Sequence, residues 1–246
     1  MSLRFHEIAE RDHRILNPFT EDQLMLLGNL CRLRPGQRQL DLCCGKGEML
    51  CRWAAAFGIT GIGVDISKVF LNAARERAAE LEVGELVDFV EGDAANYAVE
   101  PAAFDIVSCV GATWIGNGLS GTLELLKPGL RDADSLVLVG EPFWNDEPPQ
   151  EAYTVLADGD RHLFTTLAGT LDRFKAAGLE LLEMVIADHH GWDRYEAAQW
   201  PAVLDWLREH PDDPEAAELR RFFEKNQRAY LTFGRRYFNW GVFVLR

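Results

Sequence analysis

The chain has 246 residues, of which 48% are hydrophobic and 26% charged, a composition typical of a folded globular protein and not of a disordered one. Its net charge of −14 argues against nucleic acid or an anionic membrane as the partner, because both require clustered Lys and Arg. No run of about 18 apolar residues and no apolar leader segment occurs, so we expect a cytoplasmic protein.

Residues 1–35 are expected to form an N-terminal helical segment. From residue 39 onward, short β-rich runs alternate with helical patterns, which predicts a parallel sheet covered by helices. Residues 39–44 form the first expected strand, and residues 47–57 the first helix, with Leu50, Trp53 and Ala54 on one face. Residues 60–66 form the second strand, and Ser67 can cap the helix that follows.

Further strands are expected at residues 86–93, 104–112, 134–142, 179–188 and 237–246. Residues 166–178 predict a helix that ends at Gly178, and residues 141–150 predict a loop. Between the last two strands lies a mainly helical stretch, with one helix through residues 201–210 and another beginning at Asp213 and Pro214. We therefore expect an α/β domain of residues 36–187 and 237–246, with residues 188–236 inserted as a helical cap.

The turn after the first strand is rich in glycine, as in nucleotide-binding folds, but it lacks the third glycine of a dinucleotide site. Gly45 and Gly47 are followed by Leu50, and Asp41 lies inside the strand, where a carboxylate would repel a diphosphate. Asp65 ends the second strand, where an acidic side chain can accept both ribose hydroxyls. Asp93 ends the third strand, near the expected adenine. These features predict a nucleoside ligand that carries a positive group and no diphosphate.

S-adenosylmethionine (SAM) has this chemistry, and the chain resembles the class I, Rossmann-like, SAM-dependent methyltransferases from about residue 39 to 141. The matching motifs are "LDLCCGKGE", "GVDIS", "EGDAANY" and "LKPGL". The resemblance implies a doubly wound seven-stranded sheet whose last strand is antiparallel. It also implies that the cofactor contacts Asp41, Gly45, Gly47, Asp65, Ile66, Asp93, Ala94 and Val110. Cys43 occupies the position of the family's first glycine.

The methyl acceptor is expected to lie beyond the fourth and fifth strands. Glu141 is a candidate base, or a group that steers a cationic acceptor, although a loop carboxylate bonded to backbone N–H groups is the structural alternative. His189 is a weaker candidate. Trp114 and Trp144 could wall the acceptor pocket, and Trp192 and Tyr195 belong to an aromatic cap, although aromatic residues at such spacing are also common in a core.

The leading hypothesis is a SAM-dependent methyltransferase that acts on a small molecule under this cap and releases S-adenosylhomocysteine (SAH). The alternatives are a non-catalytic SAM-binding module and, less favoured, an NAD(P)-linked oxidoreductase. The five cysteines form no CxxC pair and no zinc-ligand spacing, so we expect reduced thiols and no metal. The acceptor and the oligomeric state are not readable from the sequence.

Overall fold

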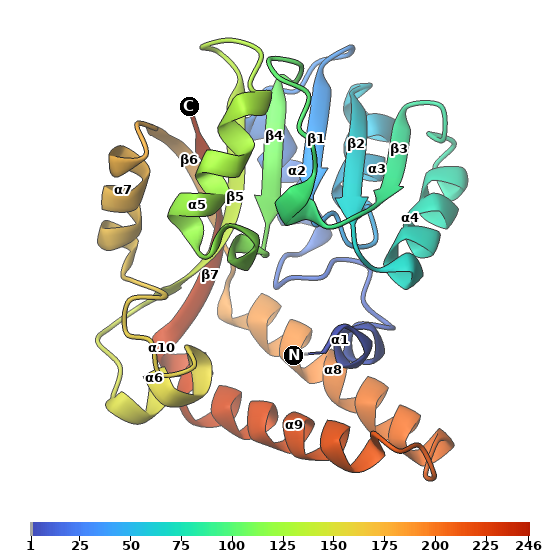
Figure 1. Cartoon of the computed structure of the whole chain (residues 1–246), viewed down its shortest axis with the longest axis vertical. Helices are drawn as coiled ribbons and strands as arrows, with labels where there is room; N and C mark the ends of the chain where they lie inside the picture. The colour runs from blue at the N-terminus through green and yellow to red at the C-terminus, as the bar shows by residue number, and fades with distance from the viewer. Residues whose placement is uncertain (1) are drawn as a thin grey trace. The chain divides into compact units, whose positions relative to one another are not determined.

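The computed structural model describes residues 2–246, which group into two compact units (Figure 1). The sheet unit comprises Thr20–Glu141, Ala168–Ile186 and Trp240–Arg246. The helical unit comprises residues 2–19, Pro142–Leu167 and Ala187–Asn239. These units differ in their bounds from the expected segments, since residues 20–35 group with the sheet and residues 142–167 with the helices.

The sheet unit is built on seven strands in the order β3-β2-β1-β4-β5-β7-β6. Their bounds are β1 Arg38–Leu42, β2 Thr60–Asp65, β3 Val87–Glu91, β4 Ile106–Val110, β5 Leu136–Trp144, β6 Leu181–Ile186 and β7 Phe238–Leu245. β1 pairs in parallel with both β2 and β4, whereas β7 runs antiparallel to β6. The expected Rossmann-like sheet with its antiparallel last strand is therefore confirmed. Because the strand order reverses direction between β1 and β4, a crevice for a ligand is expected at their carboxyl ends.

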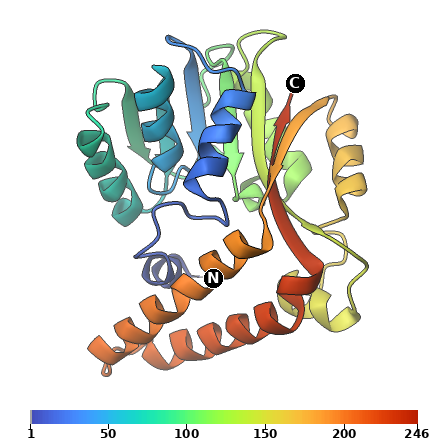
Figure 2. The same cartoon turned by 180° about the vertical axis from the view of Figure 1, so that it is seen from behind.

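Helices cover both faces of this sheet (Figures 1 and 2). α2 (Glu21–Leu30) and α3 (Glu48–Phe57) lie on one face, with α4 (Lys68–Glu80) packed against α3, and α5 (Leu119–Leu126) lies on the other. Ser67 caps α4 as predicted, accepting the Phe70 N–H at 3.1 Å. α7 (Leu167–Ala176) places Phe174 against Phe243 of β7, with ring centroids 5.2 Å apart.

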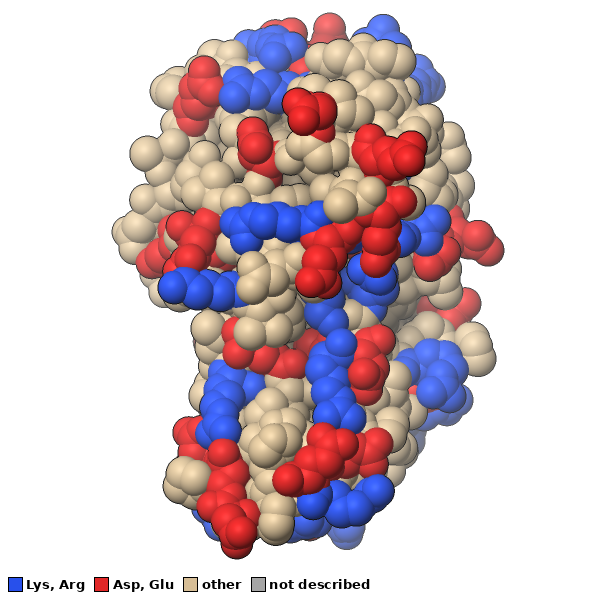
Figure 3. Space-filling model, turned by 90° about the vertical axis from the view of Figure 1, so that its right-hand side faces the viewer, with Lys and Arg blue, Asp and Glu red and all other residues tan. Residues whose placement is uncertain are grey.

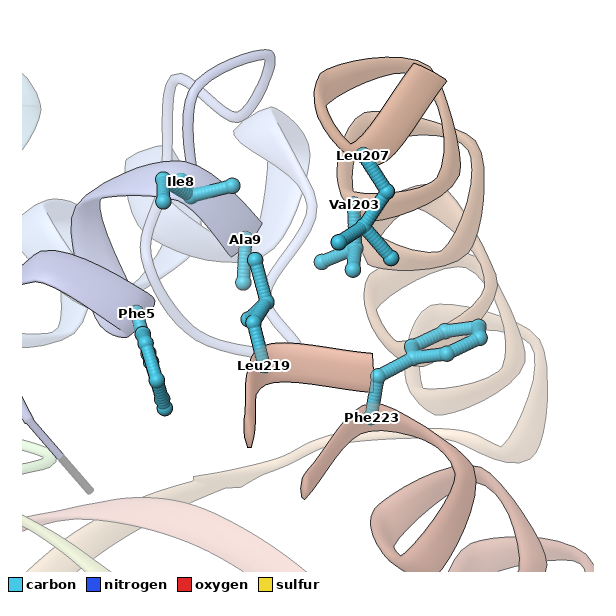
Figure 4. Close-up of a cluster of buried hydrophobic side chains, with 7 residues drawn as sticks. All are labelled: Phe5, Ile8, Ala9, Val203, Leu207, Leu219 and Phe223. Atoms are coloured by element: carbon cyan, nitrogen blue, oxygen red, sulfur yellow. The ribbon is translucent and has the colours of Figure 1, made fainter. Parts of the chain in front are cut away.

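The helical unit contains α1 (Leu3–Ala9), α6 (Gln150–Leu156), α8 (His189–Glu209), α9 (Ala216–Ala229), a π-helical turn at Tyr230–Gly234 and α10 (Arg235–Tyr237). Buried apolar side chains from α1, α8 and α9 form one cluster, shown in Figure 4: Phe5, Ile8, Ala9, Val203, Leu207, Leu219 and Phe223. This cluster holds the three helices together, because none of them could bury its apolar face alone.

Two helix boundaries differ from the predictions. α9 begins at Ala216, because the Asp213 carboxylate accepts the Glu215 N–H at 2.9 Å and the chain turns before the helix starts. α8 begins at His189 and continues through Pro201. Since proline has no N–H, the helix loses one backbone hydrogen bond there, while the next two residues, Ala202 and Val203, are buried.

Charged side chains of both signs are interspersed on the face seen in Figure 3, so that the net negative charge forms no continuous field on that side. Within residues 2–246, no helix combines the length and the apolar character that a membrane span requires.

Candidate functional site

The glycine loop after β1 adopts left-handed backbone conformations at three positions. The φ angles are +60° at Cys43, +54° at Gly45 and +65° at Gly47. Gly47 is required for space as well, since a Cβ atom there would lie 2.6 Å from the Phe89 ring. A glycine adopts this left-handed conformation without strain, whereas a residue with a Cβ atom, such as Cys43, has a strain energy of about 1 kcal/mol there. The backbone is therefore that of a glycine turn, although a cysteine stands at its first position.

We expect Cys43→Val to lower the free energy of unfolding by about 1–2 kcal/mol relative to Cys43→Gly, because a β-branched residue tolerates positive φ poorly. Urea denaturation of the two variants measures this difference. Cys31→Val is the control, since Cys31 is a cysteine inside the protein with an ordinary φ of −68°. Equal stability of the Val and Gly variants at position 43 would contradict the strain.

Asp65 connects the glycine loop to the start of α4. One carboxylate oxygen accepts the Gly45 N–H at 2.9 Å, and the other accepts the Ser67 N–H at 2.9 Å. Asp65 is not the helix cap, because Ser67 has that role. Each carboxylate oxygen has a second lone pair, and the side chain is 8% exposed. The group can therefore accept two further hydrogen bonds from a ligand.

Asp41 lies one strand away, buried in the sheet. Its carboxylate accepts the Ser108 hydroxyl at 2.6 Å, and Gln39 Nε2 donates to the same hydroxyl oxygen at 3.0 Å. Burial raises the pKa of Asp41 to about 7; the Ser108 hydrogen bond lowers it and the nearby Asp65 charge raises it further. A buried carboxylate of this kind is favourable to a cationic group.

The expected adenine residues surround a short 3₁₀ turn after β3. Asp93 is exposed and accepts the Ala95 N–H at 3.0 Å, while Ala94 is buried. Ile66, the residue after Asp65, is 59% exposed, so its aliphatic side chain is accessible to a ligand. Val110 ends β4 and is half-buried. A turn of backbone N–H groups, two buried carboxylates and an exposed aliphatic side chain fit the sulfonium nucleoside that the sequence predicts.

Glu141 lies inside β5, which continues to Trp144, so the predicted loop at this point is wrong. Its carboxylate is 2% exposed and accepts the Thr113 hydroxyl at 2.7 Å. Burial raises the pKa of Glu141 to about 7, and the Thr113 hydrogen bond and the Arg173 charge counteract this shift. The donor is a side-chain hydroxyl and not the backbone N–H groups of the structural alternative. A carboxyl with this pKa can exchange a proton near neutral pH.

This pKa makes stability depend on pH. A carboxyl whose pKa is raised on folding stabilises the folded state while it is protonated, and that stabilisation is lost as pH rises from the unfolded value of 4.5 through about 7. We expect Glu141→Gln to exceed the wild type in stability by on the order of 2 kcal/mol at pH 8.5, with a smaller difference at pH 6. Urea denaturation at both pH values measures the effect; a pH-independent difference would contradict it.

The four predicted pocket residues differ in their surroundings. Trp114 lies in a 3₁₀ turn after β4 and is 69% exposed. Trp144 is buried in the helical unit, with ring centroids 5.2 Å from Tyr153 and 4.9 Å from Phe238, and its Nε1 has no hydrogen-bond partner among the described residues. Of these two, Trp114 is the ring that a molecule in solution can reach.

Trp192 and Tyr195 lie on α8, close to its first residue, His189. Trp192 Nε1 donates to Asn239 Oδ1 at 2.8 Å. The Tyr195 hydroxyl donates to Glu10 Oε1 at 2.8 Å. The sequence reasoning missed Glu10 as a member of this group, because it is 185 residues away in the chain.

The cysteines are all free. The Cys44 side chain fills the space over Gly63, where a Cβ atom would lie 2.7 Å from Sγ. Among the described residues, no group of three or more His, Cys, Asp or Glu side chains could hold a metal ion.

Comparisons with known proteins agree with this geometry. A family model described as a methyltransferase domain matches residues 40–129. The Escherichia coli (strain K12) protein YjhP is 45% identical, over 98% of this chain and 97% of its own length. A SAM-dependent methyltransferase from Geobacter sulfurreducens in complex with SAH is 43% identical, with a TM-score of 0.94 over 100% of this chain and 98% of that chain. Its counterpart from Thiobacillus denitrificans, also with SAH, is 41% identical, with a TM-score of 0.93 over the same shares.

Proposed function

Because the chain belongs to the SAM-dependent methyltransferases, we propose that it transfers the methyl group of SAM to a small molecule, with the helical unit acting as a cap for this acceptor. The observation that carries the acceptor proposal is Glu141, a buried carboxyl whose pKa is raised to about 7 by burial. It lies on β5 two residues after Val139, the residue that pairs with Cys109 of β4, and therefore near the carboxyl ends of both strands. The enzyme class itself rests on the fold and on the family.

When bound, SAM supplies a methyl group activated by its sulfonium. We propose that Asp65 accepts the ribose hydroxyls, that Asp41 lies near the amino group, and that Gly45 and Gly47 allow close approach of the loop. Ile66 and Ala94 would contact the adenine, with Asp93 at its edge; Cys43 and Val110 complete the set. Two hydrogen-bonding carboxylates and the 59% exposure of Ile66 support this assignment.

Since methyl transfer is an in-line displacement, the protein's main task is to position the acceptor and exclude water. We propose that Glu141 accepts a proton from the acceptor or holds a positive charge on it. Trp114 is exposed and directly follows Thr113, the residue that donates to Glu141. Its ring would offer the acceptor a flat surface. Trp144, Trp192, Tyr195 and, more weakly, His189 are proposed for the acceptor side as members of the helical unit.

The test of function is turnover. Purified protein is incubated with SAM and a broad panel of small acceptors, and SAH is measured by mass spectrometry. We expect acceptor-dependent SAH formation, which Glu141→Gln reduces by about 10²-fold or more while SAH affinity stays unchanged. Saturable SAH binding without turnover of any acceptor would favour the non-catalytic module. The NAD(P)-linked alternative receives no support from the relatives and solved structures.

A protein of this kind acting on a small molecule would have no need of nucleic acid or membrane, and the net charge of −14 supports that proposal. A cytoplasmic location is proposed with it, supported by five free cysteines.

The cap makes a separate prediction. We expect SAH to slow limited proteolysis within residues 188–236, because a segment that closes on bound ligand is less often locally unfolded. Trypsin cleavage sites, mapped by mass spectrometry with and without SAH, measure the effect. Equal cleavage rates in both samples would count against a cap.

A further inference from the structure

Glu196 occupies the inward face of α8. The spacing of Trp192, Glu196, Gln199 and Val203 by four, three and four residues places them on one helix face. Val203 is 2% exposed and belongs to the apolar cluster of the helical unit (Figure 4). An ionised carboxylate on such a face normally requires donors or a positive charge. Glu196 has no hydrogen-bond donor and no ion-pair partner among the described residues.

The donors around Glu196 already bind other carboxylates. Tyr195 and Gln199 donate to Glu10 Oε1 at 2.8 and 3.1 Å, and His13 Nδ1 lies 2.6 Å from Glu10 Oε2. Asp193 lies on α8 three residues before Glu196, and it accepts hydrogen bonds from the Tyr230 hydroxyl at 2.8 Å and the Arg235 guanidinium at 2.9 Å. Glu196 therefore remains a carboxyl without a counter-ion inside the helical unit.

Aromatic rings surround the same part of α8. The Trp192 ring centroid lies 6.2 Å from that of Tyr195, edge to face, and 6.2 Å from that of Tyr230, nearly parallel to it. The His13 ring also stacks on Tyr195, with ring centroids 5.1 Å apart. Aromatic faces next to a carboxylate are the usual means by which proteins bind organic cations.

The electrostatics agree with this arrangement. Burial, and then the Glu10 charge, raise the pKa of the Glu196 carboxyl to about 7. The Glu196 charge in turn contributes to the raised pKa of both Tyr195 and Tyr230, so its carboxyl lies near both hydroxyls. An added positive charge would be stabilised here, and an added neutral group would leave the carboxyl unpaired.

We propose that the helical unit binds the ammonium or quaternary ammonium group of the methyl acceptor, with Glu196 as its counter-ion and Trp192, Tyr195 and Tyr230 around it. This inference rests on the proposed function and narrows it to acceptors that carry an organic cation. It concerns binding alone and leaves open which atom of the acceptor receives the methyl group.

The experiment compares cations with neutral molecules of the same shape. Choline and its neutral isostere 3,3-dimethylbutan-1-ol, and benzylamine and benzyl alcohol, are titrated into SAH-saturated protein by calorimetry at pH 8. We expect at least one cation to bind at least tenfold more tightly than its neutral partner. Equal binding within both pairs, or no saturable heat with either cation, would overturn the inference.

Variants separate this role from a structural one. Glu196→Gln keeps the volume and removes the charge, so we expect it to abolish the preference for the cation while the melting temperature does not fall and SAH affinity is unchanged. Glu218→Gln, on the exposed side of α9, is the matched control and should keep the preference. A preserved preference in Glu196→Gln would overturn the inference. Failure of SAH itself to bind would instead contradict the proposed function.

A pH series gives an independent readout. We expect wild-type affinity for the cation to rise as pH increases through about 7, because the counter-ion ionises there, and the affinity of Glu196→Gln to rise less. The other charged or titratable groups that face this position are the same in both proteins: Glu10, His13, Asp193, Tyr195, Tyr230 and Arg235. Parallel pH curves for the two proteins would also overturn the inference.

Discussion

Asp65→Ala is expected to weaken SAH binding by 10²-fold or more. The proposed ribose contacts are two hydrogen bonds to a charged acceptor, each of which contributes about 1.5–3 kcal/mol. The same substitution also removes the bonds that hold Gly45 and Ser67, so the glycine loop loses its attachment to the start of α4. Affinity would be lost through both effects. Isothermal titration calorimetry with SAH measures the change.

Two further variants make this result interpretable. Asp88→Ala changes an exposed aspartate on β3 and should bind SAH like the wild type. Asp65→Asn keeps the size of the side chain and one carbonyl acceptor, so it tests the charge even if Asp65→Ala folds poorly. Wild-type affinity in both position-65 variants would show that the cofactor is held elsewhere.

The second large effect concerns stability. Glu48, the first residue of α3, is 4% exposed, and its carboxylate binds two arginines: Arg52 Nε at 2.8 Å, and Arg77 of α4, also through Nε, at 2.8 Å. Arg52 continues the network to Glu21 of α2 at 2.7 Å. We expect Glu48→Ala to reduce the free energy of unfolding by about 3 kcal/mol, because it leaves two partly buried guanidinium groups without their shared counter-ion.

Glu80 provides the control for this prediction. Its carboxylate also pairs with Arg77, at 2.8 Å, but it is 50% exposed. Glu80→Ala should therefore cost less than about 1 kcal/mol. Urea denaturation of both variants measures the difference, and a similar loss in the two would contradict a special role for the buried carboxylate.

Because Glu48 directly follows Gly47, a looser α3 start should also weaken SAH binding.

The strands, and the places of the candidate cofactor residues along them, were predictable because their signals are local. Short, mainly apolar runs bounded by turn residues marked β1 to β7, and Ser67 preceding an amphipathic helix identified the start of α4. Asp41, Gly45, Gly47 and Asp65 lie within a single βαβ stretch of the chain. A local pattern of this kind specifies which strand end a side chain occupies, and neighbouring parallel strands then bring those ends together.

The errors arose where a distant contact outweighed the local pattern. β5 extends through Trp144, beyond the predicted strand end at Pro142, because Trp144 packs against the rings of Tyr153 and Phe238. α9 starts later than predicted because Asp213, the expected cap, bonds Arg4 of α1 at 2.5 Å as well as the Glu215 N–H. In each place one partner, Phe238 for Trp144 and Arg4 for Asp213, lies far outside any stretch of sequence whose periodicity predicts an element.

By itself, the sequence determined the order of strands and helices, the glycine turn and the acidic residues at the strand ends, since each follows from residue type and spacing along the chain. Only the tertiary structure decided which donors reach which carboxylates. Three carboxylates accept hydrogen bonds from hydroxyl groups distant in the chain: Glu141 from Thr113 (28 residues away), Asp41 from Ser108 (67) and Glu10 from Tyr195 (185). Glu196 accepts no hydrogen bond from the described residues. The reason is physical: proton affinities depend on burial and on neighbours in space, and strand register and helix packing set both.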